Sequence, residues 1–262
     1  MSEHHVIQTA KQDRVNLIQI TDTHIMGHPD DRFDGVDTAA TLAAVLGRIE
    51  QVEPAPDAIL VTGDLVHDPE TGAYDRLLRL LETVRSPVFC LPGNHDDPGM
   101  MHERLNRGPI RTVKNLTAGN WRILLLDTWM PGSHAGRLSK KEMQFLVDGL
   151  DAERPEFVLI ALHHPPVSLA SSWMDAMGLE NADGFLSVID RHTRVRAVIW
   201  GHAHQEYENR RAQSLLMGTP STCVQFKPGT NRYIKDDRPP GFRQLFLYED
   251  GSVKTRLQRV AA

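Results

Sequence analysis

Five apolar runs along the chain each end in aspartate, asparagine or histidine. Before those polar residues the runs are nearly continuous in valine, isoleucine, leucine and alanine. Unbroken apolar runs followed by turn residues are typical of strands buried on both faces, as in the parallel sheets of α/β proteins. The pattern occurs at 15–24, 58–68, 88–96, 157–166 and 196–204.

Helical periodicity separates these runs. Thr38–Val52 and Tyr74–Val84 each place leucine, valine or isoleucine on one face at a spacing of about 3.6 residues. Ser139–Ala152 begins like a capping box, with Ser139 as the predicted N-cap and Glu142 three residues later. Because strands and helices alternate, the chain is predicted to be an α/β protein with helices packed outside a sheet.

After His204 the pattern changes to short alternating segments, which predict antiparallel strands that extend a second sheet. Two sheets face to face, with helices on both outer sides, would form four layers, αββα. The stretch Phe226–Gly241 is rich in glycine, proline and charge, and we interpret it as a mobile loop near the mouth of a site. The alternating segments are 207–211, 215–217, 242–248 and 252–257.

The composition is that of a globular protein. The 262 residues are 40% hydrophobic and 24% charged, with a net charge of −5, and we expect one domain over 1–262 with 1–13 as a flexible N-terminal tail. A mildly acidic chain lacks the basic footprint of a nucleic-acid-binding protein, and a basic cluster at 104–114 fits a solvated face as well as an anion site. No apolar stretch is long enough to span a membrane. Cys90 and Cys223 are too few for a disulfide framework, which predicts a cytoplasmic protein.

The polar residues at the strand ends predict a metal site, because ligands of open α/β sheets bind beyond the carboxyl ends of the strands. A single Gly-Asp is usually only a turn, but five such ends in one chain favour a common site. Oxygen and imidazole groups without thiolates suit manganese, iron or zinc, and their number suits two ions that share one carboxylate. The residues are Asp22, His24, Asp64, Asn94, His95, His163, His202 and His204.

The local spacing suggests how these side chains converge. Asp22 and His24 are two residues apart, as are His202 and His204, so in extended segments each pair points to the same side. Glycines at 63, 93 and 201 precede the candidate ligands, and we expect them to let the backbone turn sharply and approach the ions.

Taken in order, the strand-end motifs resemble those of the calcineurin-like metallophosphoesterases. The motifs are DTH (22–24), GDLVHD (63–68), GNHD (93–96), HHPP (163–166) and GHAH (201–204). The segments ITDTH, LPGNHD, GRLS (136–139) and TPSTCVQFKP (219–228) resemble, more narrowly, the bacterial class III 3′,5′-cyclic-AMP phosphodiesterases. The resemblance covers about 15–257. It implies one metallophosphoesterase domain, a four-layer αββα sandwich of two facing mixed sheets, that converts cyclic AMP to 5′-AMP.

The resemblance also implies a dinuclear centre, with two divalent or mixed-valence ions and a bridging hydroxide that attacks phosphorus. Iron or manganese is favoured, and zinc or cobalt are the alternatives. The first ion would be held by Asp22, His24, Asp64 and His204, and the second by Asp64, Asn94, His163 and His202. Asp64 is then the bridge.

His95 is implied to lie beside the substrate phosphate as the catalytic acid for the leaving O3′, and the implied substrate contacts are Asn94, His95 and His204. His163 is favoured over His164 as the ligand, so His164 is assigned to packing around the site. Asp68 and Asp96 are predicted to orient histidines.

The rest of the substrate site is less defined by the sequence. Candidate walls for a nucleoside are His67, Trp173, Phe226 and the loop before Gly241, and a loop with His134 and Arg137 can also approach. The same centre would suit another phosphoester, such as a glycerophosphodiester, a nucleotide pyrophosphate or a phosphomonoester, and a non-catalytic scaffold is the alternative from another class. We expect a small-molecule phosphodiester as the partner, no nucleic acid, no membrane, and a monomer or homodimer.

Overall fold

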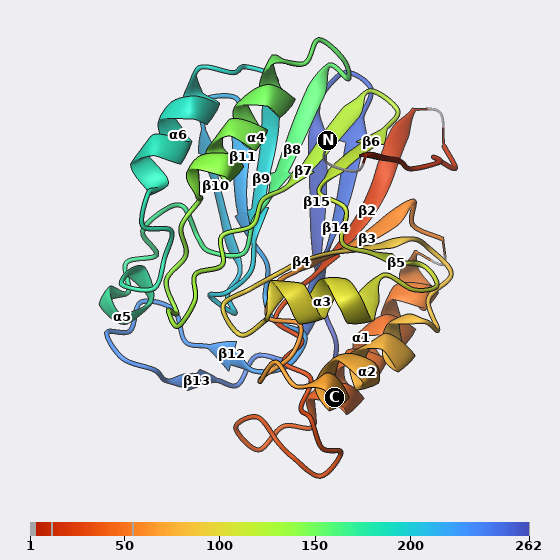
Figure 1. Cartoon of the computed structure of the whole chain (residues 1–262), viewed down its shortest axis with the longest axis vertical. Helices are drawn as coiled ribbons and strands as arrows, with labels where there is room; N and C mark the ends of the chain where they lie inside the picture. Colours follow the sequence, from red (N-terminus) through yellow and green to blue (C-terminus); the bar gives the residue numbers. More distant parts are fainter. Residues whose placement is uncertain (1–3, 12, 54, 262) are drawn as a thin grey trace.

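The chain folds into two mixed β-sheets with helices on their outer sides (Figure 1). The computed structural model describes residues 4–11, 13–53 and 55–261. None of the helices in these ranges is long and apolar enough to cross a membrane. The helices are α1 (Thr38–Val52), α2 (Thr71–Leu81), α3 (Pro98–Leu105), α4 (Lys140–Asp151), α5 (Ser172–Asp175) and α6 (Ala182–Asp190). The strands are β1 (His4–Val6), β2 (Arg14–Ile20), β3 (Ala58–Thr62), β4 (Val88–Leu91), β5 (Ile110–Arg111), β6 (Asn115–Ala118), β7 (Trp121–Leu125), β8 (Phe157–Ala161), β9 (Val195–Trp200), β10 (Tyr207–Arg211), β11 (Ser214–Gly218), β12 (Gln225–Phe226), β13 (Lys235–Asp236), β14 (Gly241–Tyr248) and β15 (Val253–Arg259).

The two large sheets face each other across a shared apolar core. One sheet has six strands in the order β15-β14-β2-β3-β4-β5, and the other has seven in the order β1-β6-β7-β8-β9-β11-β10. Buried side chains from both sheets, such as Leu17, Leu60, Leu159 and Ile199, form a single cluster between them. Helices α1, α2 and α3 pack on the outer face of the six-stranded sheet, and α4 and α6 on that of the seven-stranded sheet. The predicted αββα arrangement is confirmed.

Local signals set the starts of the main helices. Helix α1 occupies its predicted range, and the side chain of Asp37 caps it by accepting from the Ala40 N–H at 3.0 Å. Ser139 caps α4, as predicted, by accepting from the Glu142 N–H at 3.1 Å. The Glu142 carboxylate accepts in turn from the Asp127 N–H at 3.0 Å, so it ties the helix to the preceding loop.

The N-terminal segment differs from the flexible tail predicted for 1–13. Strand β1 pairs in parallel with β6 at the edge of the seven-stranded sheet. Ile7, directly after it, is buried in the core between the sheets. Burial of this one apolar side chain and the strand pairing explain why the segment is ordered. Residues 1–3 and 12 of the predicted tail lie outside the described residues.

The C-terminal strands divide between the two sheets, which corrects the prediction that they extend one second sheet. Strand β11 lies parallel to β9 and carries β10 at the edge of the seven-stranded sheet. Strand β14 instead pairs antiparallel with β2 and with β15 in the six-stranded sheet. Residues 226–241 are also not a plain loop, because β12 and β13 pair with each other there. Helices α3 and α6 and the β6–β7 hairpin escaped prediction because each is short.

Candidate metal centre

The carboxyl ends of five strands bring the predicted polar residues into one site. Strands β2, β3 and β4 run parallel in one sheet, and β8 and β9 run parallel in the other. The backbone N–H of His202 donates to both carboxylate oxygens of Asp22 at 3.0 Å, although 180 residues separate the two. Six of the seven predicted metal ligands are buried, and Asn94 is half-buried. The ends of both sheets therefore build the site together.

Five of the predicted ligands have a left-handed backbone. The φ angles are 53° at Asp22, 43° at His24, 49° at Asp64, 63° at His202 and 49° at His204. The extended geometry predicted for the two pairs of ligands is therefore wrong, and the chain instead turns back at each of these residues. A left-handed non-glycine residue costs roughly 1–3 kcal/mol and is found mainly at functional sites. The turns direct the side chains inward.

The three glycines at 63, 93 and 201 all lie in close contact with ligand residues or their neighbours, and Gly63 also needs a positive φ. Gly63 has a φ of 93°, which a side chain would disfavour, so conformational freedom is required there. At Gly93 a Cβ would lie 2.2 Å from Asp64 Oδ1, and at Gly201 it would lie 2.0 Å from Thr21 Oγ1. These two glycines are required because the ligand loops pack directly against them.

The residues predicted for the first ion contact one another through their ligand atoms. His204 Nε2 lies 3.4 Å from Asp22 Oδ1 and 3.2 Å from His24 Nε2. His24 Nε2 lies 3.5 Å from Asp64 Oδ2. Asp22, His24 and His204 thus form one group whose ligand atoms can hold a cation.

The residues predicted for the second ion converge in the same way. Asn94 Oδ1 lies 3.3 Å from His163 Nε2 and 2.9 Å from His202 Nδ1. His163 Nε2 is also 3.3 Å from Asp64 Oδ2. Since Asp64 Oδ2 contacts His24 on one side and His163 on the other, it stands between the two groups. That is the position a bridging carboxylate needs.

Backbone carbonyl groups orient the imidazole rings of His163 and His204. His163 donates Nδ1–H to the Thr62 carbonyl at 2.8 Å, and His204 donates Nδ1–H to the Val224 carbonyl at 2.6 Å. The Nε2 atom of a neutral ring then carries a lone pair directed at a carboxylate oxygen, for example that of Asp22 beside His204. A cation, either a proton or a metal ion, must lie between such a nitrogen and the carboxylate in a buried site, so the residues fit metal ions.

The electrostatics of the site also favour cations. Burial lowers the pKa of His24 and of His202 well below the ordinary value, so both rings are in the neutral form that binds metals. Burial opposes ionisation of Asp64, but the charge of His163 outweighs it and holds the pKa of Asp64 well below its usual range. Burial likewise disfavours the His163 imidazolium, yet Asp64 outweighs it and raises the pKa of His163 to about 9. The carboxylates therefore stabilise positive charge at this point.

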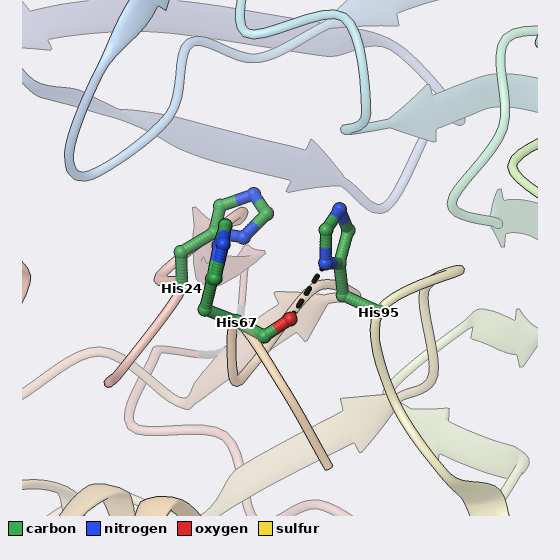
Figure 2. A group of neighbouring side chains, drawn as sticks. All are labelled: His24, His67 and His95. Carbon is green, nitrogen blue, oxygen red and sulfur yellow. Dashed lines mark hydrogen bonds between the residues drawn. The ribbon is translucent and has the colours of Figure 1, made fainter. Parts of the chain in front are cut away.

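His95 lies beside the predicted ligands with its ring fixed (Figure 2). Its Nδ1–H donates to the His67 carbonyl at 2.6 Å, and its backbone N–H donates to Asp64 Oδ1 at 2.9 Å. The rings of His67 and His95 are stacked with centroids 5.1 Å apart, and the His24 ring lies 4.8 Å from that of His95. Because Nδ1 is held by the carbonyl, Nε2 is the atom of His95 left for a substrate.

Both ring nitrogens of His164 have hydrogen-bond partners other than the predicted ligands. Nε2 donates to the His134 carbonyl at 3.2 Å, and Nδ1 accepts from the Thr128 hydroxyl at 2.7 Å. A Cβ at Gly136 would lie 2.1 Å from His164 Nδ1, so the GRLS segment packs on this ring. His164 also lies in a group with His163 and His202 whose nitrogens could hold a cation, so the choice of His163 as the ligand stays a prediction.

The predicted role of Asp68 and Asp96 in orienting histidines is not what the structure contains. Asp96 accepts from the backbone N–H groups of Gly93 at 2.8 Å and Leu65 at 3.1 Å, and it is 3.2 Å from the Tyr74 hydroxyl. It therefore joins the loops after β3 and β4, and burial raises its pKa to about 7. Asp68 forms no side-chain hydrogen bond among the described residues.

The TPSTCVQFKP segment supports two of the predicted ligands. The Ser221 hydroxyl donates to the Asp22 carbonyl at 2.8 Å and accepts from the Cys223 N–H at 2.9 Å. The Phe226 ring stacks on the His204 ring with centroids 3.9 Å apart and planes 8° apart. This segment thus positions both the backbone of Asp22 and the ring of His204.

A cavity opens over the centre, and its walls include residues that the sequence did not single out. Trp173 and Phe226 line it, as expected for candidate walls, and so does His134 from the loop expected to approach the site. Phe33 and Met177 are additions. Phe33 comes from a turn and packs 4.8 Å from the His24 ring, a contact that no local sequence signal announces. Arg137 instead pairs with Glu180 at 3.1 Å on the surface. His67, a candidate wall, packs against Phe33 and is not among the residues that line the cavity.

Comparison with known proteins identifies the family of this chain. The calcineurin-like phosphoesterase family matches residues 15–206. The 3′,5′-cyclic adenosine monophosphate phosphodiesterase CpdA of Pseudomonas aeruginosa is 35% identical over 98% of this chain and 94% of its own length. CpdA of Escherichia coli K12 is 37% identical over 96% of this chain and 92% of its own. Among solved structures, a dimetal phosphatase from Danio rerio has a TM-score of 0.69 at 17% identity, covering 95% of this chain and 100% of that one, which shows the fold alone.

The sandwich and the site define a metal-dependent phosphoesterase, and this chain belongs to the calcineurin-like phosphoesterase family. Within that family it is similar over nearly its whole length to proteins named as cyclic-nucleotide phosphodiesterases. A further example is a 3′,5′-cyclic-nucleotide phosphodiesterase from Nostoc, which is 36% identical over 94% of this chain and 92% of its own length.

Proposed function

We propose that this protein is a dinuclear-metal phosphodiesterase that hydrolyses 3′,5′-cyclic AMP to 5′-AMP. The position of Asp64 carries the proposal, since its Oδ2 lies 3.5 Å from His24 Nε2 and 3.3 Å from His163 Nε2. Its Oδ1 accepts from the backbone of His95 at 2.9 Å, which connects the metal ligands to the catalytic acid. The names of the relatives supply the substrate class.

Two ligand groups would hold the ions. Asp22, His24, Asp64 and His204 form the first, and Asp64, Asn94, His163 and His202 form the second. Bound there, two ions would lower the pKa of a shared water and neutralise charge on the phosphoryl group. We favour iron or manganese, with zinc or cobalt as alternatives, because the ligands are oxygen and imidazole without thiolate.

The residues around the ligands orient the ester and move one proton. Asn94 and His204 line the cavity and would contact the phosphate oxygens. His95 directs Nε2 toward the cavity, because Nδ1 is fixed on the His67 carbonyl at 2.6 Å. As imidazolium, His95 would donate the Nε2 proton to O3′ as the bond to phosphorus breaks, a contribution of about 10²–10⁴ in rate.

Two further expectations follow for the intact protein. We propose that 1–262 act as one domain, because both sheets contribute to one apolar cluster. We also propose a cytoplasmic location, since both cysteines are free and buried, which suits a reducing compartment.

The test is release of 5′-AMP from cyclic AMP. Metal-stripped protein is reconstituted with Mn²⁺, or with Fe²⁺ under anaerobic conditions, and bis(p-nitrophenyl) phosphate serves as a generic diester. Comparable or higher kcat/KM for cyclic AMP supports the proposal. Turnover of the generic diester alone would reassign the centre to another phosphoester, and Asp64→Ala, which removes the shared ligand, must abolish either activity.

A further inference from the structure

The cavity over the centre has two chemically different halves. One half is formed by the polar ends of the candidate metal ligands, and the other by aromatic rings and methionines. The apolar half contains Phe33, Trp173, Met174, Met177 and Phe226. We call Phe33, Trp173 and Phe226 the aromatic wall. A phosphate bound at the ligands would place the remainder of its ester against this wall.

The aromatic wall begins directly at the ligand histidines. Phe226 stacks on His204 at a centroid distance of 3.9 Å, and Phe33 packs 4.8 Å from His24. Trp173 follows, 5.6 Å from Phe226 with the planes at 55°. Planar rings thus extend outward from the first ligand group, at distances typical of aromatic packing.

Side-chain bonds hold the wall together before any ligand arrives. The Ser171 hydroxyl at the start of α5 donates to the Thr230 carbonyl at 2.5 Å, which attaches α5 to the segment after β12. Lys235 of β13 donates to the Asp34 carbonyl at 2.8 Å, which attaches that segment to the turn with Phe33. The three rings come from three separate parts of the chain, and these bonds fix them relative to one another. A fixed surface loses little freedom when a ligand binds.

Trp173 also has an unused donor. Its Nε1–H is buried and has no hydrogen-bond partner among the described residues, and the ring lines the cavity. Indole is a donor only, and a buried donor without an acceptor is costly. An acceptor on a bound ligand would give this donor a partner, and a flat group is the shape that fits among aromatic rings.

We propose that the aromatic wall binds the purine base of the substrate and that Trp173 selects it by donating Nε1–H to a base acceptor. The proposal rests on the function proposed above, because it assigns the specificity of the same site. A purine offers a planar apolar surface together with unprotonated ring nitrogens at its edge. A small alkyl ester has neither, so the wall distinguishes nucleotides from other phosphodiesters.

The kinetic test compares cyclic AMP with the same cyclic phosphate without its base, 1-O-methylribose 3′,5′-cyclic phosphate. Trp173→Phe keeps a ring and removes the donor, and we expect kcat/KM for cyclic AMP to fall about tenfold while that for the abasic ester stays within twofold. Trp173→Ala also removes stacking, and the loss should approach about 100-fold. The retained abasic activity shows that the variants are folded. Trp129→Phe is the matched control, because it makes the same change at a tryptophan that does not line the cavity.

A binding test without turnover separates this proposal from the function itself. The chain has four tryptophans, so the indole N–H signals of ¹⁵N-labelled protein loaded with diamagnetic Zn²⁺ are few, and Trp173→Phe assigns one of them. We expect 5′-AMP to shift the Trp173 signal and ribose 5-phosphate to leave it in place. Trp121, which donates to the Tyr248 carbonyl, and Trp200 in the core should not move with either.

The outcomes are distinct. If the protein cleaves no cyclic nucleotide but 5′-AMP shifts the Trp173 signal, the base site stands and the proposed reaction fails. The opposite result has two parts: Trp173→Phe keeps the wild-type ratio of kcat/KM for cyclic AMP to kcat/KM for the abasic ester, and 5′-AMP moves no Trp173 signal. If cyclic AMP is nevertheless cleaved, the base site is wrong and the reaction stands.

Discussion

Gly93→Ala tests whether the packing of loops, and not only the ligands, sets the geometry of the centre. The added Cβ would lie 2.2 Å from Asp64 Oδ1 and 2.8 Å from His163 Cε1. An ordinary non-bonded contact is about 1 Å longer than the shorter of these distances. The protein interior is too densely packed for other residues to make that room. Asp64 must therefore move by about that amount. A displacement of about 1 Å at a reacting centre lowers the rate roughly 100-fold.

The assay measures metal content after reconstitution, kcat on bis(p-nitrophenyl) phosphate and stability in urea. We expect less than two ions per chain, a kcat lower by about 10²-fold, and a loss of about 1–3 kcal/mol from overpacking. The matched control is Gly47→Ala on α1, where a Cβ would meet no atom within 4 Å beyond the adjacent residues and the backbone of its own helix. It should keep full activity and gain up to about 1 kcal/mol from helix propensity, or about 2–4 °C in Tm. Two bound ions and wild-type kcat in Gly93→Ala would refute the reasoning.

Three further predictions follow. His95→Ala should keep both ions in metal analysis and lower kcat about 10²-fold or more, and an unchanged kcat would remove its acid role. Ser221→Ala removes the donor to the Asp22 carbonyl and the acceptor for Cys223, so the free energy of unfolding in urea should fall by about 2 kcal/mol, and a change below the error of the measurement would contradict it. Burial raises the pKa of the Cys223 thiol to about 12 and that of Cys90 above its ordinary value, so at pH ~8 only about 10⁻⁴ of Cys223 is thiolate. A thiol-reactive disulfide should then label neither residue in the native protein and both in guanidinium, and rapid native labelling would show that the thiols are accessible.

The sequence predicted those features that local chemistry decides. The strand ends at Asp22, Asp64 and His202 were visible because each apolar run stops at a polar residue. Helix α1 kept its predicted range because its periodicity and the Asp37 cap agree. The residues of the candidate site could therefore be named before the structure, which then brought them within contact of one another.

Other features depended on which distant segments pair and pack. Strand β14 joins β2, and not the second sheet, because the choice of partner depends on long-range burial that no local pattern encodes. The left-handed turns at Asp22 and His204 arise where loops from both sheets must meet, so spacing along the chain could not predict them. The aromatic wall likewise unites Phe33, Trp173 and Phe226 from three separate segments. Local patterns thus encode the chemistry of the ligands. Their geometry and their neighbours depend on contacts between remote residues, which form only when the chain is folded.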